Sequence, residues 1–376
     1  MQEPFTTHLN RRLLENRLAD TTDQAPDEMA LSGNIFSDAA LHARERKRLF
    51  TETPQPVAFS GELPGPNHFL ATSVLDVPLL LTRDAGGEQH AMINACTHRG
   101  APLAPDGKHG ESRALVCPFH GWSYQPDGTL RGRPQEDAFA SPASNCGLQK
   151  LAVSERGGII VVAPTPGLSQ QQVDEATAEL VDELACYRFD TYRVLTRKTL
   201  EVNANWKLIN DLSLESYHFA NLHRDSVAQM LTSHAVFDTW AHSSRWAFPL
   251  KSIADLAGTP QEAWPQSLQG SCTYTLYPGV MVIVNALGAQ MIRAEPGREP
   301  GISRVTYTGM RIADCAEADA KAASDFGAEV FVTEDLPMAE ACQRGLAATG
   351  QSLPLGRNEP LLQYWHTLWA SATEIS

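Results

Sequence analysis

The chain has 376 residues, of which 43% are hydrophobic and 20% charged, and its formal net charge at pH 7 is −14. This composition is that of a folded globular protein, and the length suggests two domains. The acidic balance argues against a nucleic-acid partner, because phosphate binding relies on clustered Lys and Arg. No segment reaches the roughly 18 apolar residues of a membrane helix, and the N-terminus lacks a signal peptide, so we expect a cytoplasmic protein without membrane attachment.

The expected elements fall into a small β domain followed by a larger mixed domain. A polar helical pattern over 37–48 ends in Pro and Gly, and short β-prone segments alternate with turns between 68 and 163. The later segments are typical of helices at 171–187, 324–349 and 359–372 and of strands at 193–203, 271–288 and 303–313. These patterns predict an α+β fold, with one domain over 37–165 and a second over 1–36 and 166–376.

Two of the seven cysteines stand in pairs with histidine. The odd, scattered set does not indicate a disulfide framework. Cys96-x-His98 is followed after eighteen residues by Cys117-x-x-His120. Two thiolates on one iron and two imidazoles on the other make a Rieske 2Fe-2S centre. The alternatives are two unrelated pairs or a zinc site, although zinc sites usually group Cys with Cys and His with His.

A second group of candidate metal ligands follows about eighty residues later, in NWKLINDLSLESYHFANLH. Two imidazoles and one carboxylate on iron(II) leave open positions for dioxygen. His218 and His223 are the candidate imidazoles, and Glu215 shares a helix face with His218. Because His218 and His223 are five residues apart, we expect the helix to distort or end between them. Taken alone, the two histidines also fit one core and one surface residue.

These segments resemble the Rieske non-haem iron oxygenases, the family of aromatic-ring-hydroxylating dioxygenase alpha subunits. CTHRG and CPFHGWSY match the family's two cluster loops, and NWK, an acid and two spaced histidines match its iron motif. The resemblance implies a β Rieske domain and a catalytic domain of helix-grip type. It implies a 2Fe-2S cluster held by the two Cys/His pairs, and mononuclear Fe(II) held by His218, His223 and a later carboxylate.

That carboxylate is expected in FVTEDLPMAEACQRGL, which resembles the family's C-terminal helix. The second acid of the pair, Asp335, is the implied third ligand, and Pro337 suggests that the helix begins near Asp335. In the alternative interpretation, Glu334 and Asp335 only cap the helix.

The resemblance also implies head-to-tail homotrimers, in which the acid before the first iron histidine bridges two chains. That acid is Glu215, between His120 of one chain and His218 of the next. Many ring dioxygenases have Asp there, whereas Glu also resembles the choline, carnitine and betaine monooxygenase branch. At Asp211 the family commonly has Asn.

The implied function is a terminal oxygenase that hydroxylates or dihydroxylates a small organic substrate, an aromatic compound being the first choice. The alternatives are an N- or O-demethylase, a monooxygenase of a quaternary ammonium compound, or a pure Rieske electron-transfer protein. The last would have no use for His218 and His223. Since no G-x-G-x-x-G fingerprint follows a strand, we expect NAD(P)H to act through a separate flavin reductase, with or without a ferredoxin. Residues that could line a substrate pocket or simply form core are Trp240, Trp246, Phe248, Tyr274, Tyr277 and Met281.

Overall fold

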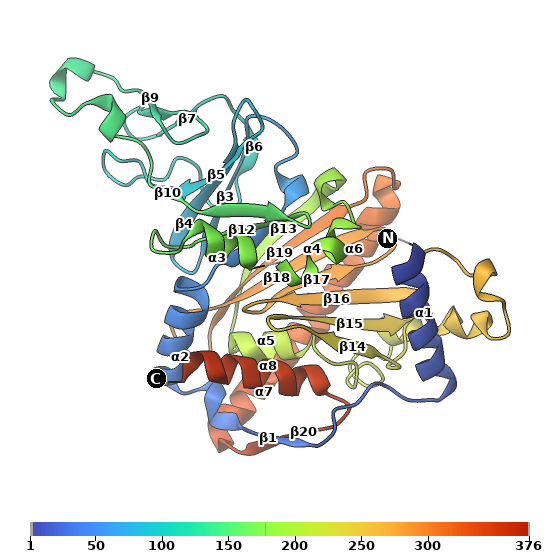
Figure 1. Ribbon diagram of the computed structural model, residues 1–376. Coiled ribbons are helices and arrows are strands. Elements are labelled where there is room, and N and C mark those ends of the chain that lie inside the picture. The colour runs from blue at the N-terminus through green and yellow to red at the C-terminus, as the bar shows by residue number, and fades with distance from the viewer. Residues whose placement is uncertain (1–2, 177, 375–376) are drawn as a thin grey trace. The chain divides into compact units, whose positions relative to one another are not determined.

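The computed structural model describes residues 3–176 and 178–374, which form two compact units (Figure 1). Unit 1 takes the chain up to Leu49 and from Arg193 onward, and unit 2 takes Phe50–Tyr192. These limits differ from the expected boundaries at residues 37 and 165. Helix α2 (Ala39–Glu45) packs against the C-terminal helix α8 (Pro360–Thr373), and helix α3 (Gln170–Glu175) packs against strand β11 (Val153–Arg156). Tertiary contacts therefore move both boundaries toward the C-terminus.

The centre of unit 1 is a seven-stranded antiparallel sheet (Figure 1). In spatial order its strands are β13 (Arg193–Val202), β19 (Ser303–Arg311), β18 (Gly288–Pro296), β17 (Val280–Val284), β16 (Gly270–Leu276), β15 (Ser243–Pro249) and β14 (Val236–Thr239). Strands β15 and β18 are buried along their whole length, so other elements cover both of their faces. The expected strand at 193–203 is confirmed as β13.

Helices pack on this sheet, and the turn that joins two of them contains Glu334 and Asp335. Besides α2, α8 and short 3-10 helices, unit 1 contains α1 (Glu3–Leu18), α5 (Trp206–Asp211), α6 (Glu317–Val330), α7 (Leu336–Thr349) and a ribbon of β1 (Met29–Ser32) with β20 (Ser352–Leu355). Helix α1 contacts β14 and β15, and both α5 and α6 contact β18. Helices α6 and α7 are joined without a loop by a π-helical turn, Phe331–Asp335. Pro337 follows that turn, where its missing N–H and fixed φ are tolerated.

Unit 2 consists of small antiparallel sheets. A five-stranded sheet has the order β10 (Lys150–Leu151), β5 (Gln89–Ile93), β4 (Val77–Arg83), β3 (His68–Val74) and β6 (His109–Glu111). Two three-stranded sheets have the orders β11, β12 (Ile159–Val162), β2 (Gln55–Phe59) and β7 (Leu115–Val116), β8 (Ser123–Tyr124), β9 (Leu130–Gly132). The β-prone segments expected between 68 and 163 are confirmed as strands, beginning with β3 and β4. The helical pattern at 171–187 instead forms two short helices, α3 and α4 (Val181–Ala185).

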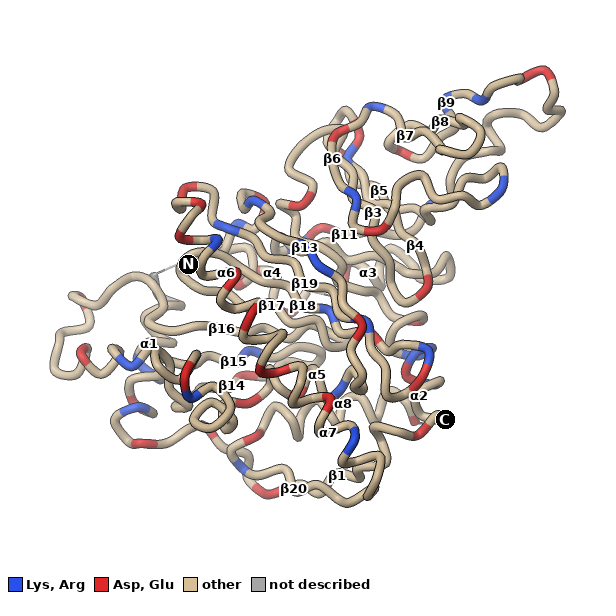
Figure 2. Tube along the Cα trace, turned by 180° about the vertical axis from the view of Figure 1, so that it is seen from behind, with Lys and Arg blue, Asp and Glu red and all other residues tan. Residues whose placement is uncertain are grey.

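One group of packed hydrophobic residues in unit 2 includes both cysteines of the candidate 2Fe-2S loops. It contains Cys96, Cys117, Trp122 and Tyr124, each at most 4% exposed. Acidic and basic residues are interspersed along the trace of both units (Figure 2). Within residues 3–176 and 178–374, the structure has no helix that is both long and apolar enough to span a bilayer.

Candidate metal centres

The two cluster loops of unit 2 repeat one backbone arrangement. The amide of Cys96 donates to the carbonyl of Ala101, and the amide of Gly100 donates to the carbonyl of Cys96, at 2.8 and 2.7 Å. In the second loop Cys117 donates to Trp122, and Gly121 to Cys117, at 2.8 and 3.0 Å. Gly100 and Gly121 have φ of 75° and 74°, a left-handed conformation that glycine adopts without strain. The glycines in CTHRG and CPFHG thus close each loop behind its cysteine.

These loops bring their histidines together beside the two buried thiols. The ring centroids of His98 and His120 are 4.6 Å apart, and both Cys96 and Cys117 are free and 2% exposed. Nδ1 of His98 is buried and has no hydrogen-bond partner among the described residues. A buried ring nitrogen without a partner is costly unless it binds something. Two thiols and two imidazoles, one of them with a vacant nitrogen, fit the ligand set of a Rieske 2Fe-2S cluster.

Tyr124 supports the first of the thiols. Its hydroxyl lies 3.1 Å from Sγ of Cys96 and accepts from the amide of Thr97. The Thr97 hydroxyl donates to the carbonyl of Cys146 at 2.7 Å, so it does not donate to Tyr124. The phenol proton can therefore point either at Oγ1 of Thr97, 3.0 Å away, or at Sγ of Cys96. Burial and the neighbouring thiol raise the pKa of Tyr124 to about 12, which keeps that proton in place at neutral pH.

Trp122, Phe139 and Arg133 form a stacked group beside the ring of His98. The ring of Trp122 stacks on it at 5.0 Å with an interplanar angle of 4°. The guanidinium of Arg133 lies 5.3 Å from the centroid of Trp122 and 4.5 Å from that of Phe139. Arg133 also forms two hydrogen bonds to Glu136, at 2.8 and 2.9 Å. These contacts leave the His98 ring little freedom to turn.

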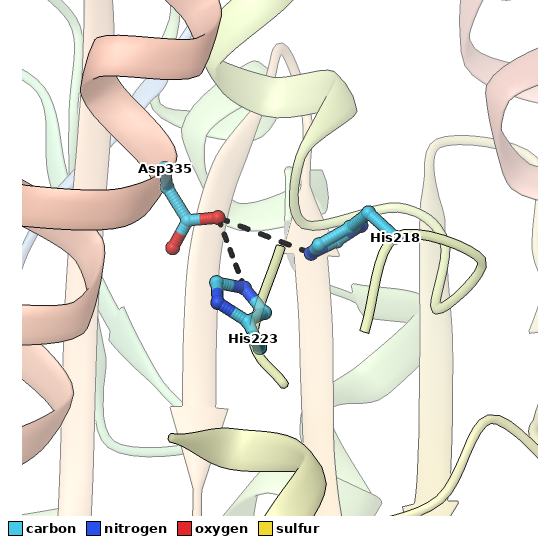
Figure 3. Close-up of side chains that lie close together, drawn as sticks. All are labelled: His218, His223 and Asp335. Carbon is cyan, nitrogen blue, oxygen red and sulfur yellow. Dashed lines mark ion pairs between the residues drawn. The ribbon is translucent and has the colours of Figure 1, made fainter. Parts of the chain in front are cut away.

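In unit 1 the structure brings His218, His223 and Asp335 together (Figure 3). Nε2 of His223 and Nε2 of His218 lie 3.2 and 3.9 Å from the same oxygen, Oδ1 of Asp335. One ligand atom from each residue lies within 4.8 Å of the others. Oδ1 of Asp335 is buried but makes no hydrogen bond to any residue that the structure describes. The donor set fits the two-histidine, one-carboxylate site of mononuclear iron.

The segment that carries both histidines is not helical as expected. Helix α5 ends at Asp211, and residues 212–226 form consecutive turns. The carboxylate of Glu215 accepts from the amides of Tyr217 and His218, and these bonds replace helical ones. The expectation of a shared helix face was therefore wrong, although Glu215 does contact His218. Asp335 is the last residue of the π-helical turn, and α7 begins at the next residue, Leu336, so the expectation that a helix begins near Asp335 is confirmed.

Each histidine presents Nε2 to Asp335 and Nδ1 to a second carboxylate. Nδ1 of His218 hydrogen-bonds to Oε1 of Glu215, and Nδ1 of His223 to Oε2 of Glu334, the latter at 2.7 Å. Burial lowers the pKa of His223, but Asp335 and Glu334 together raise it above its ordinary value. The sequence pattern did not identify Glu334 as a partner of His223, because the two are 111 residues apart.

Two of the suspected pocket residues adjoin this site. Phe219 lies 5.7 Å from His223, and both Trp246 and Phe248 contact Phe219, with centroids at 5.6 and 5.4 Å. The indole N–H of Trp246 is buried without a partner among the described residues. Trp240 instead lies under Arg245, Tyr277 stacks on Trp365, and Tyr274 and Met281 are fully buried.

Both parts of the chain that carry these sites are similar to known proteins. The family model of the Rieske [2Fe-2S] domain matches residues 53–151, and that of the ring hydroxylating alpha subunit catalytic domain matches residues 189–374. A glycine betaine monooxygenase oxygenase subunit of Chromohalobacter salexigens is 30% identical over 250 residues, 66% of this chain and 53% of that protein. A carnitine monooxygenase oxygenase subunit of Escherichia coli is 23% identical over 332 residues, 85% of each. The anthranilate 1,2-dioxygenase large subunit of Acinetobacter baylyi is 30% identical over 204 residues, 53% of this chain and 43% of that protein.

Solved structures show the same fold. The quaternary ammonium Rieske monooxygenase CntA with L-carnitine has a TM-score of 0.77 at 21% identity, covering 93% of this chain and 97% of that one. Naphthalene 1,2-dioxygenase from Rhodococcus sp. has a TM-score of 0.73 at 17% identity, covering 98% of both. These likenesses confirm the expected α+β fold, while the chain spans about half the length of the glycine betaine relative. Since the two family models together match most of it, the chain belongs to the Rieske non-haem iron oxygenase alpha subunits, which carry a 2Fe-2S cluster and mononuclear Fe(II).

Proposed function

We propose that this chain is the terminal oxygenase component of an enzyme that oxidises a small organic substrate with dioxygen. The observation that carries the proposal is the convergence of His218, His223 and Asp335 in a chain that also has a Rieske domain. A pure electron-transfer protein would need only the latter. When bound, the cluster would supply single electrons and the mononuclear iron would supply the site of dioxygen activation.

The residues of each site have separate tasks in this proposal. Cys96, His98, Cys117 and His120 would hold the cluster, and His218, His223 and Asp335 would hold the iron. Tyr124 would donate to Cys96, and Glu215 would orient His218. Phe219, Trp246 and Phe248 would exclude water beside the iron ligands and face the substrate.

The substrate class that we favour is a quaternary ammonium compound oxidised by a monooxygenase. Relatives that match over 241 to 332 residues are named for glycine betaine, choline and carnitine. Glu215 stands where ring dioxygenases often have Asp. Aromatic faces attract such cations, and Phe219, Trp246 and Phe248 provide them next to the iron ligands.

An aromatic compound, which was the first choice from the sequence alone, is the second candidate substrate. The same three side chains could stack on a ring, and the anthranilate relative supports it. Either substrate requires electrons from NAD(P)H, which we propose arrive through a separate flavin reductase, with or without a ferredoxin.

We further propose that the protein works as a head-to-tail homotrimer in which Glu215 also accepts from His120 of a neighbouring copy. Exposed apolar side chains next to both residues support such an interface. Val116 and Phe119, beside His120, are each 55% exposed, and Tyr217, beside Glu215, is 68% exposed. Phe119→Ser and Tyr217→Ser should therefore lower the mass measured by light scattering. A trimer that persists in both variants would contradict the interface.

The substrate is tested with purified protein that contains both metal centres, NADH and a surrogate reductase. Glycine betaine, choline, L-carnitine, anthranilate and naphthalene would each be added, and oxygen uptake and product mass recorded. We expect substrate-dependent uptake with one oxygen atom in the product of a quaternary ammonium substrate. A product from anthranilate or naphthalene alone would support the second candidate, and uptake with none would count against both.

A further inference from the structure

The two nitrogens of the His223 ring face two consecutive carboxylates. Asp335 lies 3.2 Å from Nε2, and Glu334 lies 2.7 Å from Nδ1. In a regular α-helix, neighbouring side chains point about 100° apart. Glu334 and Asp335 belong to the π-helical turn Phe331–Asp335, whose extra residue widens the turn. The distortion thus lets two adjacent acids reach one imidazole.

Glu334 has a second partner that fixes its orientation. The hydroxyl of Ser226 donates to the same oxygen, Oε2, at 2.9 Å. The amide of Ser226 donates to the carbonyl of His223 at 3.1 Å, so the serine belongs to the same turn as the histidine. An ionised carboxylate only accepts hydrogen bonds, so Nδ1 of His223 must carry the proton. This leaves Nε2, 3.2 Å from Oδ1 of Asp335, as the ring nitrogen available to a metal.

Glu334 reaches solvent, whereas the histidine that it contacts is buried. The Glu334 side chain is 27% exposed and borders a polar hollow of about 380 Å³ lined also by Asn221, Leu222, Arg224 and Asp225. Water in this hollow can solvate the carboxylate, whereas the His223 side chain is only 3% exposed. The Glu334 carboxylate therefore orients the buried His223 ring while it remains in contact with solvent itself.

We propose that Glu334 is a positioning residue for the mononuclear iron, with Ser226 as its support. It holds His223 in the tautomer and orientation that leave Nε2 free for the metal. The inference rests on the proposed iron site, and it assigns a different task from that of Glu215. Glu215 backs His218 and is proposed to contact a neighbouring copy, whereas Glu334 acts within one chain on iron binding.

The test measures iron affinity in protein that retains its cluster but is depleted of mononuclear iron. Iron(II) is titrated against a chelator of known affinity, and the visible spectrum of the cluster reports that unit 2 stays intact. Loss of a carboxylate behind a ligating histidine typically weakens metal binding by roughly 10- to 100-fold. We expect that loss for Glu334→Gln, a smaller loss for Ser226→Ala and partial recovery for Glu334→Asp. Glu329→Gln, an exposed acid on α6, is the matched control and should bind as the wild type does.

A second readout separates positioning from general stability. At saturating iron, the ligand-field spectrum of iron(II) should shift in Glu334→Gln and not in Glu329→Gln. Wild-type affinity and spectrum in Glu334→Gln would overturn the inference while leaving the iron site standing. If the wild type itself bound no iron, the proposed function would fail first. Should Glu334→Gln not fold, wild-type affinity in Ser226→Ala would overturn the inference.

Discussion

Glu215 hydrogen-bonds to Nδ1 of His218, while Nε2 of the same ring faces Asp335. Its other oxygen accepts from the amides of Tyr217 and His218. One carboxylate therefore shapes the turn and orients the ring at once. Because Glu215 itself lies outside the triad of candidate iron ligands, its removal should have consequences different from those of a ligand.

We expect Glu215→Gln to keep the cluster, and to keep the iron when iron is saturating, but to lose electron flow to the substrate. An amide cannot accept from both His218 and His120 of a neighbouring copy as an ionised carboxylate can. In stopped-flow measurements, the reduced cluster should not be reoxidised when substrate and dioxygen are added.

The control for this experiment is the exposed Glu262→Gln, which should react like the wild type, and Glu215→Asp should keep partial activity. Reoxidation at the wild-type rate in Glu215→Gln would argue against the bridge between copies. Loss of iron even at saturation would make Glu215 a direct ligand.

The three candidate iron ligands should be separable from the cluster. His218→Ala, His223→Ala and Asp335→Ala should each lose mononuclear iron and turnover, because each removes one donor of a three-donor site. Metal analysis and the cluster's electron paramagnetic resonance signal measure the two centres independently. His234→Ala, a histidine bonded to Thr232 and Asp20, should lose neither. Retained iron and activity in Asp335→Ala would require another third ligand.

The cluster ligands should behave in the opposite way. Cys96→Ser or His120→Ala should abolish the brown colour and the rhombic signal of the reduced protein, because each removes a ligand of one iron. Cys186→Ser, a thiol outside the cluster loops, should keep both. A signal that survives in either ligand variant would remove the cluster assignment.

Tyr124→Phe should keep the cluster but lower its reduction potential. The lost hydroxyl lies 3.1 Å from Sγ of Cys96, and a hydrogen bond to that sulfur stabilises the more negative, reduced form. A redox titration followed by circular dichroism measures the change. Tyr192→Phe, a buried phenol of the same unit that lies outside the cluster loops, is the control. An unchanged potential would mean that the phenol proton does not point at the sulfur.

The sequence predicted those parts of the sites that are local in the chain. Each cluster loop contains a Cys, a His and the glycine that closes it, so CTHRG and CPFHG specify the loop by themselves. Strands β3 and β4 lie in the expected β region, where a tight turn separates two β-prone segments.

The parts that depend on tertiary contacts were not predicted. Glu334 reaches His223 across 111 residues, and nothing in the sequence near either residue indicates that contact. The π-helical turn is a one-residue irregularity inside an otherwise helical pattern, and α5 ends at Asp211, before the turns in which the Glu215 carboxylate accepts from two backbone amides. The unit boundary at Leu49 follows from the packing of α2 on α8.

The last prediction concerns the buried ion pair of Lys207 and Glu45 in unit 1. Each side chain is 2% exposed, and the second oxygen of Glu45 accepts from the indole N–H of Trp206 at 3.0 Å. Glu45→Ala leaves a buried charge without its partner, which typically costs about 3–5 kcal/mol. We expect that loss in the free energy of unfolding at pH 7, measured by urea denaturation of the whole chain.

The pH dependence of this loss gives the decisive control. Burial lowers the pKa of Lys207 despite Glu45, so the folded protein binds fewer protons than the unfolded chain at alkaline pH, and stability rises with pH there. Without Glu45 the pKa of Lys207 falls further, because the carboxylate raised it. The difference in the free energy of unfolding between Glu45→Ala and wild type should therefore shrink as the pH rises toward 10.

Glu45→Leu combined with Lys207→Met should recover most of the stability, and Lys321→Ala, which breaks an exposed pair with Asp325, should change little. A loss in Glu45→Ala that is independent of pH would mean that lost packing, and not the unpaired charge, causes it.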